Sequence, residues 1–75
     1  VRVFPNPATT GFTLEVPETV LPASFRLVNS LGQVVGSGVV ESTRTEFSAI
    51  ELSAGFYLLD VKGKQAFQER LVIRH

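Results

Sequence analysis

The sequence predicts an all-β protein, a β-sandwich of about seven short antiparallel strands. Stretches in which apolar and polar residues alternate recur along the whole chain of 75 residues, and this period of two is typical of half-buried strands. Turn-forming residues separate these stretches at intervals of roughly 8–12 residues. No stretch shows the period of about 3.6 that an amphipathic helix requires. Together the three observations are typical of a sandwich.

The first strand is expected at residues 1–4, where Val1 and Val3 alternate with Arg2. It ends at a Pro-Asn-Pro sequence, residues 5–7, because two of these three residues lack the backbone N–H that a strand ladder needs. We expect the asparagine side chain to bind nearby amides and so to stabilise a turn.

The second strand is expected at residues 12–16. Its apolar residues alternate with Thr13 and Glu15, so one face should lie in the core and the other in water. Pro17 ends this strand. In the connection that follows, we expect Val20 and Leu21 to close one end of the core.

The third and fourth strands are expected at residues 25–28 and 33–40. The short connection between them contains Gly32, so the two strands should form a hairpin. Gly36 and Gly38 lie inside the fourth strand, where glycine weakens pairing. They predict a bulge or a strongly twisted edge.

The remaining strands are expected from residue 45, over residues 56–62, and over residues 65–74. Gly63 and Lys64 form a two-residue loop typical of a tight hairpin between the last two strands. The last strand also alternates, so its residues divide between two faces. One face carries Phe67, Leu71 and Ile73, and the other carries Gln68, Arg70, Val72 and Arg74.

The segment Leu52-x-x-Gly55-x-Tyr57 precedes the strongest strand pattern in the chain. Gly55 supplies the positive φ that a tight corner needs. The spacing resembles the tyrosine corner of immunoglobulin-like sandwiches, in which the phenol hydroxyl binds a backbone group a few residues upstream. We therefore expect an immunoglobulin-like sandwich. The alternative at this position is a turn followed by a core strand with an ordinary half-buried tyrosine.

The composition limits the classes of function. A chain of this length forms one domain, residues 1–75, and no cysteine is present to stabilise its small core by a disulfide. Seven basic and seven acidic residues give zero formal charge, so we expect no nucleic-acid partner. No apolar run approaches the length of a membrane-spanning segment. The chain opens directly on a strand pattern, so we expect it to be a piece of a longer protein.

The residues that usually carry chemistry are few and scattered. The only histidine is the last residue, His75, and no cysteine is present to act as nucleophile or ligand. The carboxylates occur singly, and no glycine-rich phosphate loop precedes a helix. We therefore expect no enzyme activity, no metal and no cofactor.

Three stretches, in order and at matching spacing over essentially the full chain, resemble the C-terminal sorting domain of cargo proteins of the type IX secretion system. They are Val3-Phe4-Pro5-Asn6-Pro7, then Leu27-Val28-Asn29-Ser30-Leu31-Gly32-Gln33-Val34-Val35, and finally Leu52-Ser53-Ala54-Gly55-Phe56-Tyr57-Leu58-Leu59 with Arg70-Leu71-Val72-Ile73.

The resemblance implies a domain that directs an N-terminal cargo protein of the same chain across the outer membrane. The cargo would enter the periplasm first and would end at the cell surface or outside the cell. The implied partners are the outer-membrane secretion machinery and a sortase-like peptidase, which cuts in a linker ahead of the first strand. The cargo is then released or joined to an anionic lipopolysaccharide.

The residues that match the family's motifs are the candidate recognition residues. They are Pro5, Asn6 and Pro7 from the opening motif, Gly55 and Tyr57 from the late motif, and Arg70, Leu71, Val72 and Ile73 from the last strand. The family more often has lysine at position 70. Arginine keeps the positive charge, but its planar guanidinium group replaces the compact ammonium group of lysine.

We expect the last strand to lie at an accessible sheet edge. The secretion machinery would then recognise it partly through hydrogen bonds to its backbone, as in β-strand addition. Homodimer formation through a strand edge is also expected to be possible, although Glu69, Arg70 and Arg74 are charges of the kind that blunt such an edge. The alternative function is a fibronectin-like or immunoglobulin-like accessory or spacer module of a secreted polysaccharide-degrading or adhesive protein.

Overall fold

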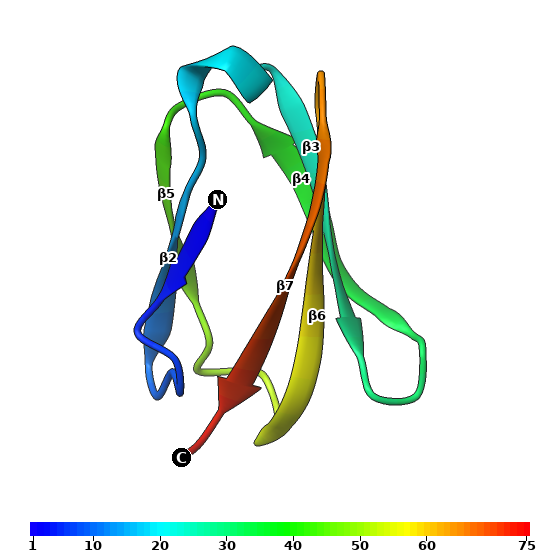
Figure 1. Cartoon of the computed structure of the whole chain (residues 1–75). Coiled ribbons are helices and arrows are strands. Elements are labelled where there is room, and N and C mark those ends of the chain that lie inside the picture. The colour runs from blue at the N-terminus through cyan, green and yellow to red at the C-terminus, as the bar shows by residue number, and fades with distance from the viewer.

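The computed structural model describes residues 1–75 and contains seven β-strands and one short 3₁₀ helix (Figure 1). The strands lie where the alternation of the sequence predicts them, so the all-β prediction is confirmed. No helix is long and apolar enough to cross a membrane. The elements are β1 (Arg2–Phe4), β2 (Gly11–Glu15), η1 (Glu18–Val20), β3 (Ala23–Asn29), β4 (Val34–Val40), β5 (Arg44–Ser48), β6 (Gly55–Lys62) and β7 (Ala66–Ile73).

The strands form two antiparallel sheets that face each other across the core (Figure 1). One sheet has the order β1-β2-β5 and the other has the order β4-β3-β6-β7. This arrangement confirms the predicted sandwich. The immunoglobulin-like label stays a prediction, because the fourth strand pairs with the third, whereas in constant-type immunoglobulin domains it joins the first sheet.

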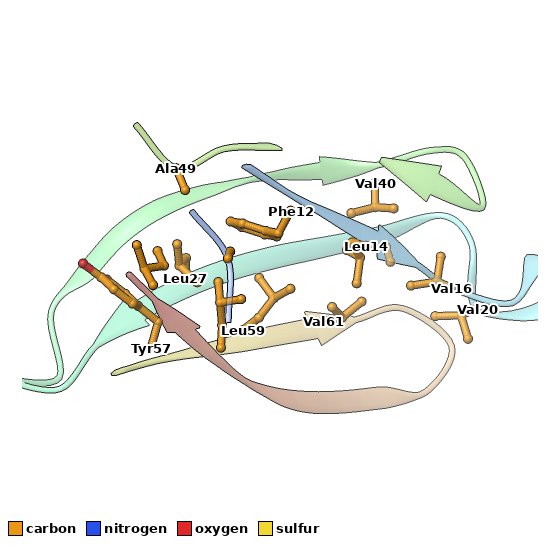
Figure 2. Close-up of a cluster of buried hydrophobic side chains, with 14 residues drawn as sticks. Phe12, Leu14, Val16, Val20, Leu27, Val40, Ala49, Tyr57, Leu59 and Val61 are labelled. Carbon is orange, nitrogen blue, oxygen red and sulfur yellow. The ribbon is translucent and has the colours of Figure 1, made fainter. Parts of the chain in front are cut away.

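The core is a single cluster of fourteen buried residues contributed by both sheets (Figure 2). Val16 and Val20 lie at one end of the cluster and Tyr57 lies at the other. Val20 is 1% exposed and Leu21 packs against the cluster half-buried, which confirms that this connection closes one end of the core. The remaining members of the cluster are Ala8, Phe12, Leu14, Ala23, Leu27, Val40, Ala49, Leu59, Val61, Leu71 and Ile73.

The outward face of β2 is only partly as expected. Glu15 faces water between two arginines, at 3.2 Å from Arg2 and 3.7 Å from Arg44. Thr13, in contrast, is buried, so the expectation that it faces water is wrong. Thr13 lies beside the large side chain of its cross-strand partner Phe4 on this face of the sheet, whereas the partners of Glu15 are the two arginines.

The hairpin between β6 and β7 is also longer than expected. Lys62 pairs with Ala66, so three residues form the loop and the two-residue prediction is wrong. The tip of this loop packs on η1, where the N–H of Lys64 donates to the Val20 carbonyl (3.3 Å). A Cβ at Gly63 would overlap the same carbonyl, so only glycine fits there.

The predicted irregularity in β4 is confirmed. The register of β4 against β3 shifts between Leu27 and Val28, which leaves Val35 without a partner, as in a β-bulge. Gly38 lies under the ring of Phe25, and a Cβ at this position would come within 2.9 Å of that ring. β4 is an edge strand of its sheet.

A tyrosine corner closes the end of the sandwich at which β6 begins. The hydroxyl of Tyr57 donates to the carbonyl of Ser53 at 2.6 Å, four residues upstream, and the ring is buried in the core. Gly55 between them has φ of +154°, a value that other residues rarely adopt. The corner is therefore confirmed over the alternative of an ordinary half-buried tyrosine.

Replacing Tyr57 by phenylalanine should lower the free energy of unfolding by about 1 kcal/mol, because only the hydroxyl and its hydrogen bond are lost. For a domain of this size the melting temperature should fall by about 4–8 °C. Thermal unfolding followed by circular dichroism measures the change. An unaltered melting temperature would show that the hydrogen bond to Ser53 contributes nothing to the corner.

Candidate functional site

Stretches that are far apart in the sequence meet at one end of the four-stranded sheet. Phe56 and Tyr57 of β6 pair with Val72 and Leu71 of β7. Ala8, which directly follows the Pro-Asn-Pro sequence, forms a parallel bridge with Ile73. Figure 1 shows the C-terminal end of β7 at the same end of the molecule as the loop after β1. The opening, late and terminal motifs of the sequence thus build one region.

Asn6 fastens the N-terminal segment to β7. Its Nδ2 donates to the carbonyl of Arg70 (2.8 Å), and its Oδ1 accepts from the N–H of Val72 (2.9 Å). The ladder continues through Ala8, whose N–H donates to the Val72 carbonyl (2.7 Å) and whose carbonyl accepts from Arg74 (2.8 Å). The side-chain amide of Asn6 therefore takes the place of a backbone peptide group beside β7.

These four hydrogen bonds, which we call the Asn6 clamp, correct two expectations. Asn6 does not bind nearby amides in its own turn, because both of its hydrogen bonds reach more than 60 residues along the chain. β7 is an edge strand, as expected, but on its outer side the carbonyl of Arg70, the N–H and carbonyl of Val72 and the N–H of Arg74 are already bonded. A partner strand cannot pair with this part of β7 while the clamp is closed.

The outer face of β6 and β7 remains open. Phe56 and Leu58 lie opposite Val72 and Arg70 on the side of the sheet that faces away from the core. Phe56 is 72% exposed, Arg70 is exposed, and the other two side chains are half-buried. We call these four residues the Arg70 patch. They line a shallow hollow of about 490 Å³ that reaches the turn after β3.

The charge of the Arg70 patch is uncompensated. Arg70 forms no salt bridge, whereas Arg26, further along the same outer face, is paired with Asp60 at 3.2 Å. The neighbouring acid in the sequence, Glu69, pairs with the buried Leu59 and so lies on the opposite face of the strand. The patch thus combines one free cation with an exposed aromatic ring.

The candidate residues from the sequence therefore divide into two groups. Tyr57, Leu71 and Ile73 are buried and form part of the core. Pro5, Asn6, Pro7 and Arg70 are exposed, whereas Gly55 and Val72 are half-exposed.

Phe56 and Leu58 are not among the candidate residues that the sequence motifs predict. The period of two in β6 could have identified them, because they alternate with the buried Tyr57, Leu59 and Val61. No group of three or more histidine, aspartate or glutamate side chains lies together in a way that could hold a metal ion.

Replacing Asn6 by alanine should remove the two side-chain hydrogen bonds of the clamp and leave the two backbone bonds of Ala8. We expect the free energy of unfolding to fall by about 1–2 kcal/mol and amide exchange at Val72 to accelerate, because its N–H loses its acceptor. Asn6→Asp keeps an acceptor and should protect the Val72 amide better than alanine does. Hydrogen exchange followed by NMR measures both, with Thr9→Ala as an exposed control in the same loop. Equal Val72 protection in Asn6→Ala and the unmodified chain would refute the clamp.

The comparisons with known proteins agree with the motifs. A search of curated proteins finds no match. The family model described as "Secretion system C-terminal sorting domain" matches residues 2–74, which is nearly the whole chain and includes every residue of the Asn6 clamp and the Arg70 patch. Domains of this family are C-terminal parts of cargo proteins, and their signal leads to export that ends at the cell surface or in the extracellular space. The chain belongs to the family of C-terminal sorting domains that act as signals for type IX secretion.

Proposed function

We propose that the outer-membrane secretion machinery recognises this sorting domain in its folded form through the Arg70 patch. The observation that carries the proposal is the unpaired Arg70 guanidinium beside the largely exposed ring of Phe56. Arginine and aromatic residues, phenylalanine included, are enriched in the cores of protein interfaces. Leu58 and Val72 add apolar surface beside this ring, and contiguous exposed apolar surface next to polar groups marks interaction sites.

The sheet underneath makes this surface rigid. Leu58 and Arg70 are cross-strand partners, as are Phe56 and Val72, so all four side chains are held at fixed spacing by the β6–β7 ladder. The Asn6 clamp holds the outer side of the same ladder. A partner that meets a pre-organised surface loses less conformational entropy on binding, which favours recognition of the folded domain.

In this account the candidate residues have different roles. Arg70 and Val72 contact the machinery directly, together with Phe56 and Leu58. Asn6 and its flanking prolines position β7 from its edge. Tyr57, Leu71 and Ile73, with Gly55 at the corner, support the surface from the core side. Lysine should replace Arg70 with only a small loss, because it keeps the charge but lacks the planar fork.

The remaining steps follow the usual course of this family. The cargo enters the periplasm first and crosses the outer membrane with this domain attached. A sortase-like peptidase then cuts in the linker ahead of β1, and the cargo is released or joined to lipopolysaccharide. The domain acts as a signal and not as a catalyst, which agrees with its scattered carboxylates and its lone histidine.

Export of a fluorescent passenger tests the proposal. The passenger carries a secretory signal peptide and this chain at its C-terminus, in a bacterium with a working type IX system and in a transport-defective counterpart. Arg70→Ala and Phe56→Ser should each reduce system-dependent fluorescence at the surface or in the medium about tenfold or more, the effect of losing a hot-spot contact. Arg70→Lys should retain most of the export.

The matched controls lie elsewhere on the surface. Ile50→Ser removes an apolar side chain that is 69% exposed, nearly as much as Phe56, and Lys64→Ala removes a cation in the β6–β7 loop. Both should leave export unchanged. Circular dichroism of each purified domain checks that the variants fold. Undiminished export of folded Arg70→Ala and Phe56→Ser, or an equal loss in the two controls, would contradict the proposed surface.

A further inference from the structure

The free edges of the two sheets are protected to different degrees. β1 has only three residues, and β5 carries Arg44 and Glu46. The outer edge of β7 is occupied by the Asn6 clamp along its last residues. β4 has neither charge nor proline in seven residues, and no other strand covers its outer side. The one protective feature of β4 is the bulge at Val35, which leaves the edge from Gly36 to Val40 regular and open, whereas natural edge strands normally carry fuller protection.

The sequence of β4 is a palindrome. It reads Val-Val-Gly-Ser-Gly-Val-Val from residue 34 to residue 40, with Ser37 at its centre. Consider two copies of β4 that pair antiparallel about a two-fold axis through Ser37. Each valine then lies opposite a valine, each glycine opposite a glycine, and Ser37 opposite Ser37 of the second copy. We propose that two copies of this chain associate through their β4 edges in this register and join their four-stranded sheets into one continuous sheet.

The backbone geometry supports the register. The N–H of Asn29 donates to the carbonyl of Gln33, so the odd-numbered residues of β3 direct their backbone groups toward β4. Their partners are the even-numbered residues of β4 from position 36 onward. Ser37 and Val39 therefore direct their N–H and C=O groups toward the open edge. The two-fold axis falls on a residue whose backbone groups are free to pair with those of its own copy.

The side chains also allow the pairing. Val39 is 65% exposed, Val34 50% and Val35 41%, so association would remove apolar surface from water. The bulge lies at one end of β4 and leaves the centre regular. In the proposed antiparallel pair the two copies of Glu41 lie beyond opposite ends of the paired strands, so no like charges meet. The chain has zero formal charge, and the two copies do not repel each other overall.

Sedimentation equilibrium of the chain over a concentration series up to about 1 mM, the range of weak association, tests the proposal. The chain should form dimers. Ser37→Pro should weaken dimer formation at least tenfold, because it removes the central outward N–H without breaking a bond to β3. Val39→Lys should do the same by placing a charge at the edge.

Two controls distinguish the β4 edge from other surfaces. Gln68→Pro removes an N–H that points outward from the other edge of the sheet, and Phe56→Lys places a charge on the Arg70 patch. Neither should change the dimer. A chain that stays monomeric up to about 1 mM, or a dimer that Gln68→Pro or Phe56→Lys disrupts as much as Ser37→Pro, would overturn the proposal.

Cross-linking tests the register, and the absence of cysteine from the chain makes it unambiguous. Ser37→Cys should form an intermolecular disulfide, because residues paired in this way lie about 5.5 Å apart at Cα, within disulfide reach. Val39→Cys is a matched exposed control. In the proposed register its two copies lie about 14 Å apart, too far for a disulfide. Equal cross-linking of both variants would refute the palindromic register.

Discussion

The Asn6 clamp is the constraint on which the rest of the structure depends. β1 pairs in the three-stranded sheet, yet the residues directly after it bond to the edge of the opposite sheet. The first segment of the chain therefore joins the two layers through hydrogen bonds in addition to the core. A chain of 75 residues without a disulfide has a small core, so such a link has a large relative effect on stability.

The clamp also connects the stability of the fold to the Arg70 patch, the surface that we propose for recognition. It occupies the outer backbone groups of β7 and so fixes the strand that carries Arg70. The inner side of the same strand places Leu71 and Ile73 in the core, and the corner at Tyr57 fixes the beginning of β6. The open edge of β4 lies on the opposite side of the sheet from β7, so the surfaces that we propose for self-association and for recognition are separate.

Much of the fold could be predicted from local patterns. Alternation, apolar runs and turn residues together located the strands, the glycines of β4 indicated its irregularity, and the spacing from Gly55 to Tyr57 located the corner. The three-residue loop after β6 was missed, because its conformation depends on a contact with the Val20 carbonyl, which is distant in sequence.

The site was harder to predict, because its central contacts are long-range. The motifs named Asn6 and Arg70, but nothing in the sequence shows that the Asn6 side chain reaches the backbone of β7 across more than 60 residues. Because these hydrogen bonds cannot be seen in the sequence, the outer edge of the last strand was predicted to be accessible to a partner. The burial of Leu71 and Ile73 follows from alternation, and the same alternation places Phe56 on the outer face.

The most direct test is NMR of the isotopically labelled chain in the presence of outer-membrane extract. The extract comes from a bacterium with a working type IX system and from a transport-defective counterpart. We expect line broadening at the amides of Phe56, Leu58, Arg70 and Val72 with the working extract alone. Broadening confined to the β1-β2-β5 sheet, or equal broadening with both extracts, would contradict recognition of the folded domain through the Arg70 patch.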